Sequence, residues 1–428
     1  MHILLIMTTL PWPLEKSGAA QRSGLLLQAL QNWGDVDVLV AAEKSYLEQP
    51  KVREHLQESP NHCIRKLELD LVDESGPWRQ LARLAPGKIG NLLRDLGRSK
   101  ANFAPDKANN EWLSRIIKNE AYDMVVVRYL QWAMKTGAAH LPMTDVLLDY
   151  DDVDWQVYRT RENQAERRTI AKRIRGRFVG WYVERIARKH LRNFAHVWVT
   201  SEEDRQDVRI QRCSVLPNVP RLSPEKERRP AHDMGKRNNI LLVATLVYKP
   251  NADGLTHFLS EIWPTIRKAH PGLRLKVVGQ LPQEIDLVNA WKQSLGVDLS
   301  GFVENLDESY EQALFTIAPV YWGGGTKIKV LESLGRRRTC VATCHALHGL
   351  GEHIRHEDSL LSAETDENFI QACLTLIEEP ETRQRLERRG EEAVRSHFSV
   401  YDFNKAVDSV MQRFVGHLRP TSEDQTAP

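Results

Sequence analysis

Residues 318–332 read Ala318-Pro-Val-Tyr-Trp-Gly-Gly-Gly-Thr-Lys-Ile-Lys-Val-Leu-Glu332. They indicate a buried strand over Phe315–Pro319, a glycine loop, and a helix that opens near Thr326. Three consecutive glycines let the backbone turn freely and let a ligand approach the main chain without meeting a Cβ atom. A helix start presents unpaired N–H groups and a partial positive charge, to which Lys327 and Lys329 add full charges. The pattern predicts a phosphate site, with a loop that merely turns a corner as the alternative.

The composition is typical of a soluble chain with two domains. Its 428 residues are many for a single core, and 41% of them are apolar while 27% are charged. A formal net charge of +2 does not favour a polyanionic partner, and no nucleic-acid-binding module is recognisable. The sequence contains no apolar run of about 18 residues, so it predicts no membrane-spanning helix. The first residues resemble a strand rather than a signal peptide. A cytoplasmic location is therefore expected.

The cysteines do not form a recognisable metal or disulfide pattern. Five are scattered along the chain, as expected for reduced thiols. Cys340 and Cys344, followed by His345, resemble the start of a metal site, but no second pair completes it. We therefore expect no metal.

Short apolar runs alternate with amphipathic segments along the whole chain. The predicted strands of the first half are Ile3–Met7, Val36–Ala41, Ile64–Leu69, Met124–Val127, Val146–Leu148 and Val197–Thr200. Those of the second half are Ile240–Ala244, Leu273–Val278, Val297–Phe302, Phe315–Pro319 and Thr339–Thr343. Their continuous hydrophobicity marks parallel strands covered on both faces. The fold class is therefore α/β, with two Rossmann-like doubly wound domains in tandem.

A proline-rich, charged stretch separates the two halves. It gives a first domain over 1–218, a linker over 219–238 and a second domain over 239–396. A tail at 419–428 is expected to be disordered. Because ligands of such sheets bind beyond the carboxyl ends of the strands, each domain is expected to form one wall of a cleft.

One segment departs from the neutral average charge. Between Arg159 and Arg192 there are twelve Lys or Arg residues and three acidic ones, interleaved with aromatic and aliphatic side chains. A basic amphipathic helix of this kind can lie on an anionic membrane surface. A solvated helix with one face on the core is the alternative, and the sequence leaves both open.

Several separated stretches resemble the GT-B-fold glycosyltransferases of the large retaining family 4 group. The similarity is greatest to its bacterial branch with a Gly-Gly-Gly-Thr-Lys/Arg loop. The resembling stretches in the first half are Pro11–Arg22, Leu148–Asp154, Val197–Asp204 and Val215–Asn218. In the second half they are Tyr248–Gly254, Trp263–Arg267, Val278–Pro282, Gly301–Leu306 and the glycine loop itself. Their shared order is more specific than any one motif.

The resemblance implies a fold and an activity. Two Rossmann-like domains would face each other across a cleft, with a C-terminal helix over 397–418 crossing back to the first domain. A sugar would pass from a nucleoside-diphosphate donor to a hydroxyl acceptor with retention, in polysaccharide or glycoconjugate synthesis. The donor is a substrate, so no cofactor is implied. The acceptor would be a glycan, a lipid-linked glycan or another hydroxyl compound. Peripheral contact with an anionic membrane, at the inner face of the plasma membrane, is left open.

The resemblance also assigns roles to particular residues. It implies donor binding by Gly18, Gly323, Gly324, Gly325, Thr326, Lys327, Leu331 and Glu332, and catalytic roles for Lys327, Lys249, Arg22 and Asp151. Glu332 would hold the ribose hydroxyls. Fixed N–H dipoles and lysine cations suit this chemistry, because they stabilise the negative charge that grows on a departing diphosphate. Asp149, Asp151 and Asp152 crowd one strand end, where like charges can raise the pKa of one carboxyl or where the aspartates simply form a turn.

The chain departs from the family pattern at several positions. Gly324 stands where the family places the earlier of two glutamates, and Tyr150 stands where it has a histidine. Ala346 and His348 replace a glycine and a glutamate. These departures leave two alternatives open, a catalytically silent subunit that binds a partner glycosyltransferase and a sugar-nucleotide epimerase of the same fold.

Overall fold

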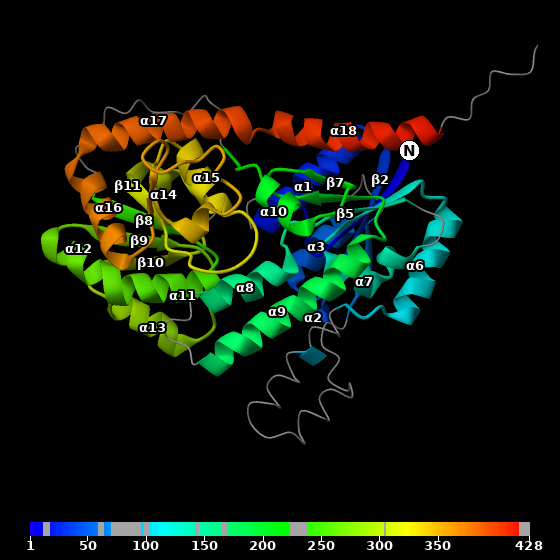
Figure 1. The fold of residues 1–428 in the computed structure, drawn as a ribbon, viewed down its shortest axis with the longest axis horizontal. Coiled ribbons are helices and arrows are strands. Elements are labelled where there is room, and N and C mark those ends of the chain that lie inside the picture. Colours follow the sequence, from blue (N-terminus) through cyan, green and yellow to red (C-terminus); the bar gives the residue numbers. More distant parts are fainter. Residues whose placement is uncertain are drawn as a thin grey trace, which may run out of the picture. The chain divides into compact units, whose positions relative to one another are not determined.

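The chain folds into two compact units (Figure 1). The computed structural model describes residues 1–11, 18–58, 64–69, 96–97, 103–141, 145–163, 170–222, 238–303 and 305–418. The first unit comprises Met1–Asp152, Trp181–Pro217 and the segment from Val400 onward; the second comprises Val153–Gly180 and Asn218–Ser399. Each unit is built around one parallel sheet.

The sheet of the first unit has seven strands in the order β3-β2-β1-β4-β5-β6-β7. The strands are β1 (His2–Met7), β2 (Asp35–Ala42), β3 (Ile64–Glu68), β4 (Met124–Arg128), β5 (Asp145–Asp149), β6 (His196–Val199) and β7 (Cys213–Val215). All neighbours pair in parallel, and β1 lies between β2 and β4, with Ile3 opposite both Val36 and Met124. The strand order reverses at β1 and β4, and ligands of doubly wound sheets bind beyond the strand ends at such a point.

Helices surround this sheet. They are α1 (Gly18–Gln31), α2 (Lys44–Leu47), α3 (Pro50–Glu58), α6 (Lys107–Glu120), α7 (Leu130–Thr136), the 3₁₀ turn η1 (Ala138–His140), α10 (Glu202–Val208) and α18 (Val400–Leu418). The terminal helix α18 packs against α1, and Trp33 Nε1 donates to Asp408 Oδ1 at 2.7 Å. The end of the chain therefore returns to the first unit, as expected.

The second unit has six strands in the order β10-β9-β8-β11-β12-β13. They are β8 (Asn239–Val243), β9 (Arg274–Val278), β10 (Val297–Gly301), β11 (Ala313–Ala318), β12 (Cys340–Thr343) and β13 (Leu361–Ala363). The order reverses at β8 and β11, so this sheet has the same kind of switch point.

The helices of the second unit follow its strands. They are α8 (Asp154–Asn163), α11 (Lys249–His257), the π turn η5 (Phe258–Ile262), α12 (Trp263–Ala269), α13 (Ile285–Gln293), α14 (Asp307–Gln312), α15 (Ile328–Gly335), the 3₁₀ turn η6 (Cys344–Leu347), α16 (Asp366–Glu378) and α17 (Pro380–His397). The long helix α9 (Ile170–Leu191) has its residues up to Gly180 grouped with the second unit and the rest with the first.

The structure confirms two Rossmann-like domains with parallel sheets and corrects local details. β7 and β13 were not predicted, because strands of three residues are too short to stand out as apolar runs. The helix after the glycine loop begins at Ile328 rather than near Thr326. Val153–Gly180 groups with the second unit, although the sequence pattern places it in the first domain. Residues 12–17, most of the linker and the tail at 419–428 lie outside the described residues.

Among the described residues, no helix has both the length and the apolar character that crossing a bilayer requires.

Candidate functional site

The glycine loop follows β11 and leads into α15 in the second unit. Gly323 has a φ of 119° and Gly325 a φ of 63°, conformations that favour glycine. A Cβ atom on Gly323 would also lie 2.9 Å from the Tyr248 hydroxyl oxygen. The backbone conformation at position 323 therefore favours glycine, and the flexible Tyr248 side chain lies close to where a Cβ atom would stand.

Lys327 holds the carbonyl groups of this loop. Its Nζ donates to the carbonyl oxygens of Gly324 at 2.7 Å and Gly325 at 2.5 Å. In a trans peptide the N–H points opposite to the C=O, so the N–H groups of Gly325 and Thr326 point away from the ammonium. Lys327 thus fixes the orientation of two successive peptide planes.

The same loop presents successive N–H groups without protein acceptors. Within the part of the chain that the structure describes, the backbone N–H groups of Gly324, Gly325 and Thr326 donate to no protein group. The three glycines are buried, and a buried N–H without an acceptor is costly. Consecutive N–H groups in such a turn form a concave anion-binding nest. The loop therefore has the backbone geometry that an anionic ligand would require.

Helix α11 packs closely against the end of β11. A Cβ atom on Gly254 would lie 1.9 Å from the carbonyl oxygen of Pro319, so only glycine permits this approach. Lys329 on α15 donates from Nζ to Asn251 Oδ1 at 2.6 Å. These contacts bring the first turns of α11 and α15 together beside the glycine loop.

Burial perturbs two ionisable groups on α15. It lowers the pKa of Lys329 to about 7, and the positive charge of Lys327 lowers it further. Burial raises the pKa of Glu332, although Arg336 and Lys329 oppose the shift. Each group is therefore displaced toward its neutral form. A bound anion would favour the charged form of Lys329.

Residues distant in sequence complete the surroundings of the loop. The N–H of Gly323 donates to Thr160 Oγ1 of α8 at 3.1 Å. Asn218 Nδ2 donates to Thr326 Oγ1 at 2.6 Å. Asn218 was predicted only as the end of the Val215–Asn218 stretch. Thr160 was not predicted, because nothing in the local sequence of α8 indicates a contact with the loop.

Two further side chains cover the start of the loop. The Arg161 guanidinium lies 5.2 Å from the centroid of the Trp322 ring. Burial, followed by the charge of Lys327, lowers the pKa of His345 in η6 to about 3, although the backbone of Gly323 and Trp322 opposes the shift. His345 is therefore neutral at physiological pH. Among the described residues, no three His, Cys, Asp or Glu side chains gather as a metal site would require.

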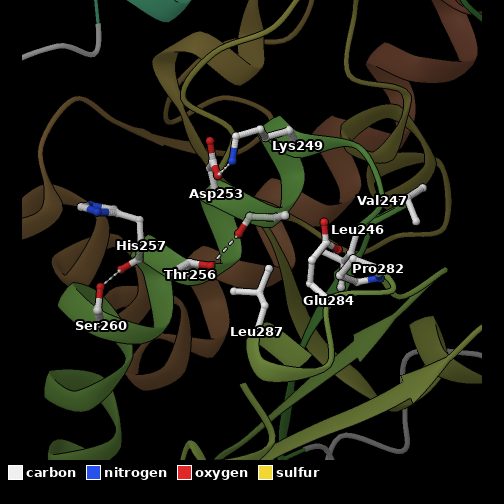
Figure 2. A pocket seen from close by; sticks show the side chains of 11 residues that line it. Leu246, Val247, Lys249, Asp253, Thr256, His257, Ser260, Pro282, Glu284 and Leu287 are labelled. Atoms are coloured by element: carbon white, nitrogen blue, oxygen red, sulfur yellow. Dashed lines mark hydrogen bonds and ion pairs between the residues drawn. The ribbon is translucent and has the colours of Figure 1, made fainter. Parts of the chain in front are cut away.

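The other predicted residues of the second unit have different surroundings. Lys249 is exposed, and its Nζ pairs with Asp253 Oδ1 at 2.9 Å rather than with a residue of the glycine loop. Both line a cavity of about 570 Å³ between α11 and the start of α13, with Glu284 and Leu287 on its other side (Figure 2). Leu331 is fully buried and belongs to the apolar core beneath α15.

In the first unit, the structure brings Arg22 and Asp151 into a buried ionic network. Arg22 is 2% exposed, and its Nη2 lies 2.6 Å from Asp149 Oδ1. Arg128 bridges the two carboxylates, with 2.8 Å to Asp149 Oδ2 and 2.8 Å to Asp151 Oδ2. Arg22 also donates to the carbonyl oxygens of Leu216 and Pro217. Gly18 begins α1, the helix that carries Arg22.

This network does not show the raised carboxyl pKa that was one of the two alternatives for the three aspartates. Burial alone would raise the pKa of Asp149, but Arg22 and Arg128 outweigh it and hold this pKa below its usual value. The carboxylates are therefore paired with arginines rather than left to repel one another. Arg128 was missed, because a lone arginine at the end of an apolar run carries no recognisable signal.

Comparison with known proteins agrees with this architecture. Residues 237–379 match the family model described as Glycosyl transferases group 1. No curated protein sequence matches the chain.

Solved structures match nearly the whole chain at low identity. Sucrose-phosphate synthase from Thermosynechococcus elongatus is similar with a TM-score of 0.66 and 16% identity, over 97% of this chain and 100% of that one. Anabaena HepE in complex with UDP and glucose is similar with a TM-score of 0.61 and 13% identity, over 96% and 100%. A TarM variant from S. aureus, in complex with fondaparinux, α-GlcNAc-glycerol and UDP, is similar with a TM-score of 0.63 and 9% identity, over 96% and 99%.

The fold of the chain therefore matches that of solved GT-B glycosyltransferases, and the family match covers residues 237–379 of the second unit.

Proposed function

We propose that the protein transfers a sugar from a nucleoside-diphosphate donor, bound on the second unit, to a hydroxyl acceptor. The proposal rests on the glycine loop, in which Lys327 holds two carbonyl groups while the neighbouring N–H groups have no acceptor among the described residues. A diphosphate would satisfy those N–H groups. The family match over 237–379 covers this loop and both helices beside it.

The proposed site suits a departing diphosphate. Negative charge grows on the phosphate oxygens as the glycosidic bond breaks, and preorganised N–H dipoles stabilise that charge more than they stabilise the ground state. Lys329 adds a cation once an anion restores its proton. Glu332 lies one helical turn further along α15, where its carboxyl oxygens can accept hydrogen bonds from a ribose diol.

Retention at the anomeric carbon is the stereochemical course we propose. The stretch 318–332 contains cations, neutral donors and a single carboxyl group, Glu332, which the proposal assigns to the nucleoside. In a front-face reaction the leaving phosphate accepts the proton of the acceptor hydroxyl, so a strong protein base is unnecessary. We further propose a glycan or other glycoconjugate as acceptor, in line with the family resemblance.

A thermal-shift screen of nucleotides and nucleotide sugars tests the proposal. UDP and its sugars are the first candidates, since HepE and TarM are both similar in fold and were solved with UDP. A ligand that binds only the native state raises the melting temperature. We expect one nucleotide class to raise it, and Glu332→Gln to reduce the shift while the exposed α14 control Glu308→Gln keeps it. If no nucleotide stabilises the chain, the proposal fails; binding without turnover would favour a catalytically silent subunit.

A further inference from the structure

One face of α9 exposes large apolar side chains to solvent. Ile174 is 65% exposed, Phe178 45% and Trp181 52%. Their spacing of four and three positions places them on the same side of the helix. Three neighbouring apolar side chains of this size on a solvent-facing ridge are a recognised mark of an interaction surface.

The helix packs onto the protein through its opposite side. The buried side of α9 is formed by Val179, Val183, Ala187 and Leu191, each at most 2% exposed. Small and aliphatic residues thus anchor the helix. Ile174, Phe178 and Trp181 lie outside this buried side.

Basic residues share the exposed side. Arg177, Arg185 and Lys189 are exposed, and the Arg185 guanidinium lies 5.9 Å from the Trp181 ring centroid. With 3.6 residues per turn, the three apolar and three basic positions span about a third of the helix circumference. We call this set, Ile174, Arg177, Phe178, Trp181, Arg185 and Lys189, the α9 stripe.

The α9 stripe contains no acidic residue. From Ile174 to Leu191 the one acidic residue is Glu184, which lies at the margin of the stripe in an ion pair of 2.8 Å with Arg188. The stripe therefore combines three large apolar side chains with three basic ones and no acidic one. That combination is complementary to a bilayer with anionic headgroups.

We propose that the α9 stripe docks the protein on an anionic lipid surface. Ile174, Phe178 and Trp181 enter the boundary between headgroups and acyl chains, while Arg177, Arg185 and Lys189 extend to the lipid phosphates. A second copy of the chain fits this surface poorly, because a two-fold contact would bring the same cations face to face. This inference concerns where the protein acts and does not depend on donor binding.

Co-sedimentation of the full chain with lipid vesicles tests the proposal. We expect binding to vesicles of phosphatidylcholine and phosphatidylglycerol at 3:1, weaker binding to pure phosphatidylcholine, and loss of the difference at high salt. The apolar triple variant Ile174→Ser, Phe178→Ser, Trp181→Ser should lower the partition coefficient at least tenfold. The charge variant Arg177→Gln, Arg185→Gln, Lys189→Gln should abolish the preference for the anionic lipid.

A matched control distinguishes binding through the stripe from non-specific adsorption of exposed apolar side chains to vesicles. Ile285, Leu295 and Phe302 are 72%, 74% and 56% exposed elsewhere in the second unit, and their replacement by serine should leave vesicle binding unchanged. Circular dichroism melting confirms that each variant folds. The nucleotide thermal shift serves as an independent readout that none of these variants should alter.

Three outcomes would overturn the proposal. The first is a wild-type chain that does not sediment with anionic vesicles, and the second is an apolar triple variant that binds as the wild type does. The third is a wild-type chain that is dimeric without lipid while the apolar variant is monomeric, which would identify the stripe as an interface between copies.

Discussion

Lys329 and Glu332 lie three positions apart on α15, and burial displaces their pKa values in opposite directions. Neither charge is fully stabilised by the protein alone, although Asn251 accepts a hydrogen bond from Lys329. Strongly perturbed groups beside a turn with unpaired N–H groups are typical of functional sites. A ligand of complementary charge would favour the charged form of each group.

The depressed pKa of Lys329 gives the stability of the protein a defined pH dependence. In the native state this lysine loses its proton near pH 7, whereas in the unfolded chain it keeps the proton up to its ordinary pKa of 10.5. Between these values the unfolded state binds more protons, so the free energy of unfolding should rise with pH by up to about 1.4 kcal/mol per pH unit. Urea denaturation at a series of pH values measures this slope.

Lys329→Met should remove that contribution to the slope, since the variant has no proton to bind at this position. The exposed Lys249→Met serves as the control and should keep the wild-type slope. An unchanged slope in Lys329→Met would show that the lysine does not titrate near neutral pH.

Asp149 is the residue on which the charge balance of the first unit depends. Asp149→Asn would leave the buried Arg22 and Arg128 short of a negative partner. Breaking a buried ion pair in this way costs about 3–5 kcal/mol. Chemical denaturation should show a loss of that size, against less than about 1 kcal/mol for the exposed Asp253→Asn. A loss in Asp149→Asn as small as the control's would contradict the structural role of the network.

At the scale of elements, the site depends on how α11 meets β11. Gly254 allows the helix to approach the carbonyl oxygen of Pro319 closely, and Tyr248 and Pro250 lie near the position that a Cβ atom on Gly323 would occupy. Residues at the start of α11 therefore limit the space around the glycine loop. The ordering of this loop before any ligand arrives lowers the entropy cost of binding.

Gly254→Ala should separate α11 from β11. The new Cβ atom would lie 1.9 Å from the carbonyl oxygen of Pro319, so the backbone must shift. We expect a loss of about 1–3 kcal/mol in stability, as for other overpacked sites, together with weaker nucleotide binding. Gly272→Ala is the matched control, because its Cβ would meet nothing within 4 Å. Equal stability and nucleotide affinity in the two variants would contradict the close packing.

Elements differed in how well the sequence predicted them. Buried strands such as β1 and β4 stand out, because every residue between Ile3 and Met7 and between Met124 and Arg128 is buried, and the apolar run is continuous up to the arginine. The two strands of three residues do not reach that length. The start of α15 was placed too early because the Lys327 side chain bends back onto the carbonyl groups of Gly324 and Gly325, a local conformation that helix propensity does not encode.

At the scale of the whole molecule, alternation of strands and helices was sufficient to predict two doubly wound sheets. The grouping of distant segments was harder to predict. Val153–Gly180 joins the second unit through contacts such as that between Thr160 and Gly323, which are 163 positions apart. The hydrogen bond between Trp33 and Asp408, which joins α1 to α18, spans 375 positions. Local sequence patterns do not indicate a contact at that distance, so the return of α18 to α1 was expected from the family resemblance alone.

The residues of the candidate site also differ in how far the sequence could predict them. The glycine loop, Lys327 and Glu332 were recognisable from local pattern and resemblance. Thr160, Arg128 and His345 could not be assigned, because their partners lie far away in sequence.

Isothermal titration calorimetry of UDP into the full chain, with GDP and ADP in parallel, examines donor binding without an acceptor. We expect one nucleoside diphosphate to bind with one-to-one stoichiometry, and Glu332→Gln to weaken it about tenfold, a loss of roughly 1.4 kcal/mol. At about pH 8 the binding heat should depend on the buffer, because Lys329, with its pKa of about 7, takes up a proton as the diphosphate binds. Absence of binding heat with all three nucleotides would contradict the proposed glycosyltransferase.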